Sequence, residues 1–321
     1  MLRTAIYTTA LLCAILPCEY LSADEFPQPV IQEDWWPIAG NPDLGAISSP
    51  KQQPVDFAVW QAADGTWQLW SCIRKTTCGG KTRVFYRWEG KSPTATNWEP
   101  QGIAMQADPE VGETEGGLQA PHVVLVGKTY HMFYGDWNNI CHATSEDGKN
   151  FQRVVQPNGK TGMFSEGKEG FARDVMLLPV ANGWHGYYTA NPSVTPSISQ
   201  KNRQGAVYLR KTRDFKTWTD SVVVAFGGLT DTTAYSAECP FVFERDGHYY
   251  LLRTQKYGKD QISTLYHSDD PNYFGINQDE RFLVARMPVA APEIVLHNGE
   301  YYVFALNPEL NGIRATKLTW E

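Results

Sequence analysis

Three kinds of pattern are absent from this 321-residue sequence, and each absence removes a class of function. No CxxC pair and no HExxH motif occurs, so no transition-metal site is predicted. There is no basic run and the net charge is −7, which argues against nucleic acid or an anionic membrane surface as the partner. No apolar run beyond the N-terminal one is long enough to span a bilayer. The expected partner is a neutral or weakly charged molecule.

The N-terminus has the pattern of a secretory signal. Residues 1–23 combine Arg3, an apolar run over 10–16 and a small-residue ending at Ala23. We expect its removal, a secreted or periplasmic location, and one mature domain over 24–321. Four cysteines then remain, namely Cys72, Cys78, Cys141 and Cys239. The first two are close enough in sequence for a small disulfide loop, but spacing alone does not decide whether they form one.

Five segments of the sequence share one hairpin pattern, in which aliphatic and aromatic residues flank a turn that contains glycine. The turn glycines recur at intervals of roughly 50–65 residues. They are Gly65, Gly127, Gly183, Gly247 and Gly299. Each repeat has room for about four strands, and such small sheets gain a continuous core by packing around an axis. The sequence therefore predicts an all-β fold, a five-bladed β-propeller with four antiparallel strands per blade.

The ends of the chain do not follow the repeat. Residues 24–54 contain six prolines and few strand signals, so we expect an irregular lead-in laid over the propeller. The fifth repeat is short after its hairpin, and the N-terminal segment is one candidate to complete that blade. No amphipathic helix is predicted.

Three acidic residues occur nine positions before a turn glycine, namely Asp56, Asp174 and Glu238. The first strand of each propeller blade lines the central channel, so we expect these acids to converge in one pocket. Like charges there raise the pKa of at least one carboxyl, which leaves one group protonated and another ionised. Paired carboxylates of this kind cleave glycosidic bonds. We assign Glu238 as acid, Asp56 as base or nucleophile and Asp174 as modulator. For any one acid alone, the alternative is a strand cap or a cation ligand.

These residues resemble the five-bladed propeller glycosidases of glycoside hydrolase family 43 and, more distantly, family 32, over all five repeats. Family 43 enzymes use an Asp base in blade one, an Asp modulator in blade three and a Glu acid in blade four, which the three acids match. Arg173-Asp174 is similar to the start of the Arg-Asp-Pro motif of family 32, and Glu238-Cys239 to its Glu-Cys motif. The resemblance implies inversion and a sugar held by Arg173.

Further sugar-binding candidates are Trp137, Asn191 and Tyr235, which lie at hairpin ends or in rim loops. Two more are His122 in the second blade and Glu293, a possible pocket acid in the fifth blade that is offset by three residues from the others. His122 follows Ala120-Pro121, which resembles the Ala-Pro-Glu of many family 43 members. No cofactor is required, although the channel acids offer the oxygen ligands that a structural calcium ion takes. The predicted function is a glycosidase acting on a plant- or algal-type oligo- or polysaccharide.

Two other functions stay open at this point. One is a non-catalytic propeller that binds carbohydrate or protein through the same face. The other is a sialidase-like enzyme, suggested by the Ser-Glu-Asp-Gly sequence at 145–148 but lacking an arginine triad. Neither the sugar nor the oligomeric state follows from the sequence.

Overall fold

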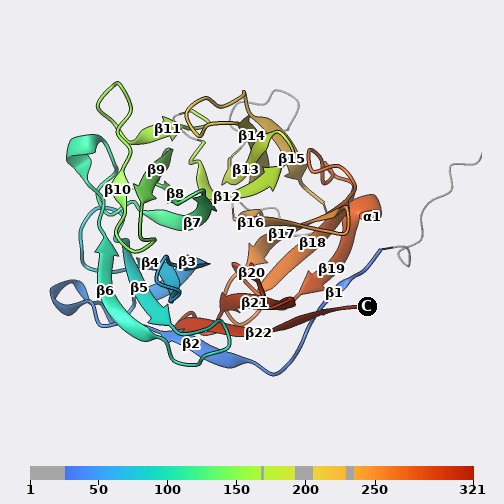
Figure 1. The fold of residues 1–321 in the computed structure, drawn as a ribbon, viewed down its shortest axis with the longest axis horizontal. Coiled ribbons are helices and arrows are strands. Elements are labelled where there is room, and N and C mark those ends of the chain that lie inside the picture. Colours follow the sequence, from blue (N-terminus) through green and yellow to red (C-terminus); the bar gives the residue numbers. More distant parts are fainter. Residues whose placement is uncertain (1–25, 168–169, 192–204, 229–234) are drawn as a thin grey trace, which may run out of the picture.

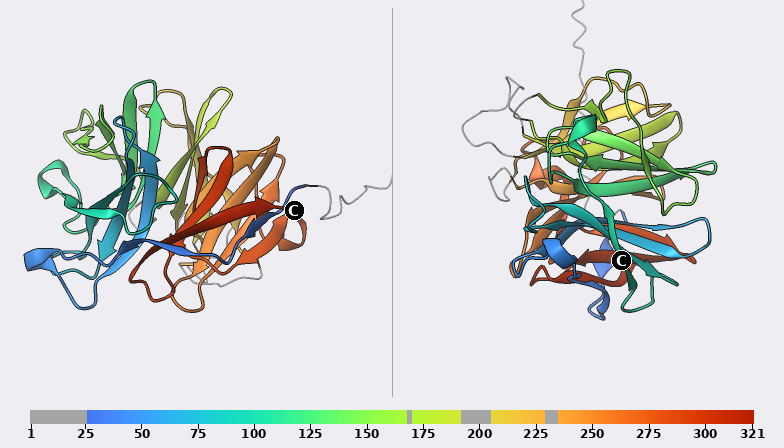
Figure 2. Two further views of the ribbon diagram at one scale, coloured as in Figure 1. Left: turned by 60° about the horizontal axis from the view of Figure 1, so that its bottom comes forward. Right: turned by 90° about the vertical axis from the view of Figure 1, so that its left-hand side faces the viewer.

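The computed structural model describes residues 26–167, 170–191, 205–228 and 235–321. The predicted signal over 1–23 lies outside these ranges. The described chain forms five antiparallel sheets that stand around a common centre, as Figure 1 shows face-on and Figure 2 from the side. The predicted five-bladed β-propeller with four strands per blade is confirmed.

The blades follow one another along the chain, each starting with its innermost strand. Blade 1 contains β3 (Gln53–Gln61), β4 (Trp67–Arg74), β5 (Val84–Gly90) and β6 (Glu99–Met105). Blade 2 contains β7 (Gln119–Val126), β8 (Thr129–Gly135), β9 (Ile140–Ser145), β10 (Gln152–Arg153) and β11 (Gly162–Phe164), the last two both paired with β9. Blade 3 contains β12 (Arg173–Val180), β13 (Gly183–Ala190), β14 (Ala206–Thr212) and β15 (Val222–Phe226).

Blade 4 contains β16 (Glu238–Arg245), β17 (His248–Lys256), β18 (Ile262–Ser268) and β19 (Leu283–Met287). Blade 5 contains β20 (Glu293–His297), β21 (Glu300–Leu306) and β22 (Gly312–Trp320), with β1 (Pro29–Ile31) and β2 (Trp36–Gly40) outside β22. Helical segments in the described ranges are short: η1 (Gly45–Ile47), η2 (Pro109–Val111) and α1 (Asp279–Phe282).

The N-terminal segment closes the ring. Both β1 and β2 pair with β22, which supplies the missing strand of blade 5 and places the C-terminus beside β1 (Figure 1). Gln28 and Glu321 exchange backbone hydrogen bonds of 2.8 and 3.0 Å. The expectation of an irregular lead-in is therefore wrong for these two strands. Their prolines argued against strands in the sequence. Proline is nevertheless tolerated in edge strands, because an edge strand leaves one row of backbone groups unpaired.

Aromatic side chains fill the space between neighbouring blades. Trp60 and Trp70 of blade 1 lie 6.0 and 5.4 Å, centroid to centroid, from Phe151 of blade 2. The Trp60 indole N–H also donates to the Gly148 carbonyl at 2.8 Å. Large buried rings of this kind typically contribute about 3–5 kcal/mol each when compared with alanine. The many aromatic residues of the sequence thus hold the blades together.

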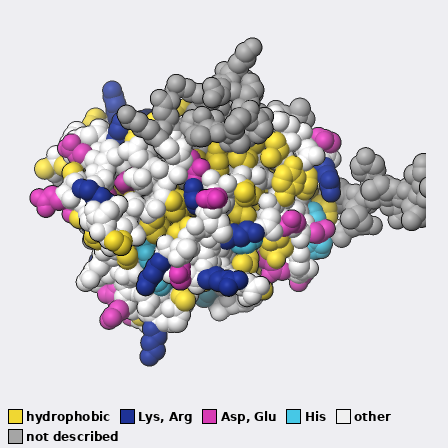
Figure 3. Space-filling model, turned by 90° about the horizontal axis from the view of Figure 1, so that it is seen from above, with side chains coloured by type: hydrophobic (Ala, Val, Ile, Leu, Met, Phe, Trp, Pro, Cys, Tyr) yellow, Lys and Arg dark blue, Asp and Glu magenta, His cyan; other side chains and the backbone are white. Residues whose placement is uncertain are grey.

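The described cysteines are free thiols. Cys72 is buried and its Sγ donates to the Leu118 carbonyl at 3.3 Å, so it is not bridged to Cys78. None of the helices in the described ranges has the length and apolar character needed to cross a bilayer. On the face seen in Figure 3, lysine and arginine side chains are scattered among acidic and uncharged ones.

Candidate active site

Each blade has a residue with a left-handed backbone near the start of its inner strand, within the strand in blades 1 to 4 and two residues before it in blade 5. These five corner residues are Asp56 (φ 35°), Ala120 (φ 37°), Asp174 (φ 54°), Cys239 (φ 47°) and Ala291 (φ 47°). In blades 1 to 4 the pairing with the second strand shifts register at this place, as in a β-bulge. Bulges change the direction in which a side chain points. All five corner residues line one cavity of about 20 Å³ in the centre of the ring, close to the volume of a single water molecule.

Glu238 precedes its corner residue by one position. It pairs with Thr254 as Arg173 pairs with Thr189, so Glu238 is structurally equivalent to Arg173 rather than to Asp174. The predicted equivalence of the three acids is therefore wrong by one residue in blade 4. The cause is the turn glycine used as marker: Gly247 lies inside the turn after β16, whereas Gly183 is already the first residue of β13.

The three predicted catalytic acids nevertheless come together. Carboxylate oxygens of Asp56 and Asp174 lie within 4.8 Å of each other. The backbone N–H of Cys239, next to Glu238, donates to Asp174 Oδ2 at 3.1 Å. The exposed fractions of Asp56, Asp174 and Glu238 are only 7%, 3% and 8%, so their charges interact with little screening by water.

Asp174 is the acid whose protonation this environment changes most clearly. Burial raises its pKa well above the ordinary value of 3.8, and the negative charges of Glu238 and Asp56 raise it further. Its Oδ1 atom is buried and has no hydrogen-bond partner among the described residues. The site therefore favours the neutral form of Asp174.

Glu238, in contrast, is paired with a cation. Arg173 Nε donates to Glu238 Oε1 at 2.9 Å, and Nη2 of the same guanidinium contacts the same oxygen. Arg173 Nη1 donates to the Phe171 carbonyl at 2.8 Å, which fixes the guanidinium in place. Burial lowers the pKa of Arg173, but Glu238 and Asp174 raise it by more, so the net shift is upward. Arg173 and Glu238 therefore form a buried ion pair with two contacts to one carboxylate oxygen.

Two side chains donate hydrogen bonds to Asp56, and one of them had no recognised signal in the sequence. The Tyr257 hydroxyl donates to Asp56 Oδ1 at 3.1 Å, and Cys239 Sγ donates to the same atom at 3.2 Å. Burial raises the pKa of Tyr257 well above 10, with Asp56 as the next cause, so the phenol stays neutral and keeps its proton for this bond. Cys239 was part of a recognised motif, but Tyr257 follows the far end of β17 and belongs to none.

Arg83 is a further residue that motifs did not reveal. Burial lowers its pKa, but the charges of Cys72, Asp56, Asp174 and Glu238 raise it on balance, which marks the guanidinium as a neighbour of the acids. Arg83 Cζ lies 5.0 Å from the ring centroid of Trp137, and Lys81 Nζ lies 4.7 Å from it. Through Arg83, the predicted sugar-stacking residue Trp137 is connected to the acid site.

The other predicted sugar contacts are distributed over two places. Glu293 lines the small cavity with the acids, and its burial raises its pKa well above 4.5. It also borders a pocket of about 420 Å³ formed by the five inner strands. His122 lines that pocket too, with its ring centroid 6.5 Å from that of Phe241, and burial lowers its pKa to about 4. His122 is not among the residues that line the small cavity with Asp56 and Asp174.

Asn191 and Tyr235 flank segments outside the described ranges. The side-chain oxygen of Asn191 is buried without a hydrogen-bond partner among the described residues. Tyr235 is 66% exposed. Both remain predicted sugar contacts.

The described channel offers few ligands for calcium. Ca²⁺ takes six to eight oxygens, whereas the pocket beyond the acids is mostly apolar and its carboxylates are Glu244 and Glu293. A calcium ion there would take most of its ligands from water, so no chemical step is assigned to one.

No protein-family model matches this sequence, and no curated protein matches it either. Solved structures do match. A thermostable family-43 glycoside hydrolase superposes with a TM-score of 0.57 at 18% identity, over 87% of this chain and 92% of that one. The chain has the fold of family 43 glycoside hydrolases.

Two more solved structures of similar fold illustrate the range. An endo-arabinase from Bacteroides thetaiotaomicron superposes with a TM-score of 0.61 at 13% identity, over 85% of this chain and 97% of that one. A β-xylosidase/α-arabinofuranosidase from a compost microbial metagenome, solved with xylotriose, superposes with a TM-score of 0.59 at 14% identity, over 88% and 96%. The resemblance noted in the sequence thus holds for the fold.

Proposed function

We propose that the protein is a glycoside hydrolase that cleaves a glycosidic bond in an oligo- or polysaccharide. The observation that carries this proposal is the meeting of Asp56, Asp174 and Glu238 at one place in the ring, with Asp174 favoured as neutral and Glu238 paired with Arg173. A binding protein needs no such group of three buried acids. Glycoside hydrolysis requires two carboxyl groups, one that gives a proton and one that accepts a proton or attacks the sugar.

The proposed substrate class is a plant- or algal-type polysaccharide or its fragments. Proteins of similar fold bear the names endo-arabinase and β-xylosidase/α-arabinofuranosidase, which makes pentose-containing glycans the first substrates to test. Trp137 offers an aromatic face beside Arg83, and aromatic faces stack on sugar rings. With the predicted signal over 1–23, we expect the enzyme to act outside the cytoplasm.

We assign Asp56 as the base or nucleophile, because it already accepts hydrogen bonds from Tyr257 and Cys239 and so is suited to carry negative charge. Asp174 modulates the site and Glu238 donates the proton to the leaving oxygen. By the family resemblance we propose inversion.

Glu238 can donate a proton only after its ion pair with Arg173 opens, because the guanidinium donors occupy the oxygen that the proton would bind. We infer that sugar hydroxyl groups take over the Arg173 donors when substrate binds. Asp174, whose raised pKa favours the protonated form, and Glu238 then share one proton, so that Glu238 can carry it when the bond breaks.

The test compares leaving groups. Glu238→Gln should reduce kcat/KM by about 10²- to 10⁴-fold on an unactivated xylo- or arabino-oligosaccharide, the usual contribution of a general acid. The same variant should recover most of its activity on a dinitrophenyl glycoside, which needs no proton to depart. Asp56→Asn should lose activity on both substrates. Glu244→Gln, on the same strand but at the exposed far end, is the matched control and should behave as wild type.

Three results would contradict parts of this assignment. Equal activity of wild type, Glu238→Gln and Asp56→Asn would remove the assignment of these two residues as acid and base. Recovery on the activated substrate by Asp174→Asn, and not by Glu238→Gln, would make Asp174 the donor. A first product with the same anomeric configuration as the substrate, observed by NMR in the first minutes, would contradict inversion.

A second candidate function is a non-catalytic carbohydrate- or protein-binding propeller. The cavity beside Asp56 and Asp174, of about 20 Å³, favours it, since a sugar ring needs more room than one water molecule and would be bound outside this cavity, away from the acids. Binding of xylotriose by calorimetry with no cleavage over days would support this alternative.

A further inference from the structure

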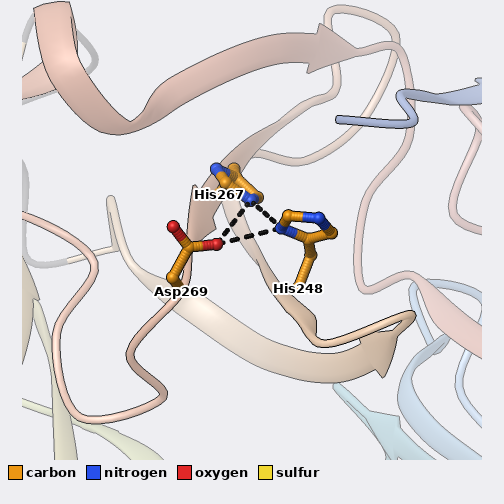
Figure 4. A group of neighbouring side chains, drawn as sticks. All are labelled: His248, His267 and Asp269. Atoms are coloured by element: carbon orange, nitrogen blue, oxygen red, sulfur yellow. Dashed lines mark hydrogen bonds and ion pairs between the residues drawn. The ribbon is translucent and has the colours of Figure 1, made fainter. Parts of the chain in front are cut away.

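A second cluster of polar side chains lies at the opposite end of blade 4 from the acids. His248 is the first residue of β17, next to the hairpin turn, whereas Glu238 pairs near the other end of that strand. His248 Nδ1 lies 2.9 Å from Asp269 Oδ1 and 3.0 Å from His267 Nε2, and His267 Nε2 lies 3.6 Å from the same Asp269 oxygen. Figure 4 shows these three atoms facing one another.

The triangle of atoms has the size of a metal site. A point equidistant from the three lies about 1.9 Å from each in their common plane, so an ion slightly above that plane is about 2.0–2.1 Å from all three. Zinc bonds to imidazole nitrogen and carboxylate oxygen have this length. A small movement of the side chains suffices to give a regular site.

Hydrogen bonding alone satisfies this cluster poorly. His248 Nδ1 carries at most one proton, yet it has both Asp269 Oδ1 and His267 Nε2 within hydrogen-bond distance. His267 Nε2 is too far from Asp269 Oδ1 to donate to it well, at 3.6 Å. A cation bound to all three atoms gives each lone pair a partner.

We propose that His248, His267 and Asp269 bind one divalent transition-metal ion, with Zn²⁺ as the first candidate. Two imidazoles and one carboxylate are ligands that suit zinc, whereas calcium prefers a set made of oxygens. The absence of a metal motif in the sequence does not oppose this site, because its residues come from two strands and the turn after the second.

The surroundings support a structural role for the ion. Phe26 stacks on the His267 ring with centroids 3.7 Å apart and an interplanar angle of 8°. The ring of Tyr250 lies 5.5 Å away on the same sheet. Asp269 is exposed on 66% of its side chain, which leaves room for water as the fourth ligand. The ion would hold β17, β18 and the following turn together beneath the N-terminal segment.

Blade 2 contains a matched control. His131 and His142 lie on the corresponding pair of strands, β8 and β9, with Nδ1 and Nε2 also 3.0 Å apart. In the described part of the chain, however, no group of three ligand residues includes this pair. It is a histidine pair without the third ligand, so it should bind zinc weakly.

The experiment uses the tag-free full chain after treatment with a chelator. Calorimetric titration with Zn²⁺ should show one ion per chain, and titration with Ca²⁺ should show none at this site. His248→Ala and Asp269→Asn should each weaken zinc binding by at least about tenfold. His131→Ala should leave it unchanged. Substitution with Co²⁺ gives a second readout, a visible absorption band that the Asp269→Asn variant should lose.

Zinc binding that is absent from the wild type, or equally strong in His248→Ala and Asp269→Asn, overturns the proposal. Equal weakening by His131→Ala overturns it as well, since the ion would then be bound by histidines in general. Asp269 is exposed, so its asparagine variant should fold, and circular dichroism of the metal-free protein checks this. Glycosidase activity is not a readout here, which keeps this test independent of the proposed function.

Discussion

Asp174 shows how one side chain can serve chemistry at the expense of folding. Its pKa in the folded protein lies well above 3.8 because of burial and the nearby negative charges. A carboxyl of this kind stabilises the folded state below the pKa of the unfolded chain, and this contribution is lost as the pH rises through the folded pKa. At neutral pH, Asp174 therefore reduces stability.

Asp174→Asn should remove this penalty. We expect the variant to melt at least about 2 °C above the wild type at pH 8, the shift that about 1 kcal/mol produces in a large domain. The two proteins should melt together near pH 3.5, where the carboxyl is neutral in both states. Activity should fall at every pH. The measurement is the melting temperature as a function of pH, by scanning calorimetry.

Asp246→Asn is the control, because Asp246 has the same left-handed backbone but lies exposed in a hairpin turn. This control should change neither the melting temperature nor the activity. A variant Asp174→Asn that is less stable than wild type at pH 8 would mean that the charge of Asp174 is held favourably.

Strand β1 is short, yet it joins the two ends of the ring. The backbone N–H of Gln32, just after β1, donates to the Lys317 carbonyl at 3.0 Å, and its side-chain Nε2 donates to Thr319 Oγ1 at 2.7 Å. Two substitutions distinguish the contributions of these bonds. Alanine at this position deletes only the side-chain bond, and proline deletes both.

Gln32→Ala should lower the free energy of unfolding by about 1 kcal/mol, and Gln32→Pro by roughly 2–3 kcal/mol, since it also leaves the Lys317 carbonyl without its donor. Urea unfolding followed by tryptophan fluorescence measures both. If the two variants lose the same free energy, the backbone pairing of the N-terminal segment contributes nothing to closure.

The hairpins were predictable because their signals are local. Glycine turns such as Asp64-Gly65 and Asn298-Gly299 lie between β-rich residues, and their recurrence indicates the number of blades. The sequence made the N-terminal segment a candidate to complete blade 5, but the strands β1 and β2 and their register against β22 were not predictable, because the pairing joins positions nearly 290 residues apart. The one-residue error at Glu238 has the same origin: a glycine marks a turn without fixing which turn position it occupies.

The candidate site was predictable only in part, for a similar reason. The acids come from the inner strands, whose hairpin pattern is recognisable in each repeat, so their meeting follows from the fold. Tyr257 and Arg83 also lie beside Asp56 and the other acids, but each stands just beyond the end of a strand, where no motif marks it. The cluster of His248 and His267 likewise depends on the register of β17 against β18, which only coordinates reveal.

The molecule as a whole carries buried histidines whose effect on stability opposes that of Asp174. His142 is the clearest case: its ring stacks on Phe133 at 4.6 Å, and burial lowers its pKa from 6.5 to about 3. A neutral buried histidine stabilises the fold above its unfolded pKa, and this contribution is lost as the pH falls below 6.5. Stability should therefore decline on the acid side.

Between pH 6.5 and pH 5, His142 alone should remove roughly 2 kcal/mol from the free energy of unfolding, at about 1.4 kcal/mol per pH unit. His142→Gln should be less stable overall but should show a shallower decline over this interval. His297→Gln, at the end of strand β20, should keep the wild-type decline. Denaturant unfolding at several pH values measures the slope, and a wild-type slope in His142→Gln would contradict this account.

The bent corner that every blade carries makes the propeller a ready frame for engineering. Asp56, Asp174 and Cys239 already equip three of the five corners with reactive groups, while Ala120 and Ala291 fill the same geometry with a methyl group only. Because the cavity has room for about one water molecule, only a small side chain such as serine could be introduced at either alanine without displacing its neighbours. The ring thus offers two further positions from which a hydroxyl group could reach the acids.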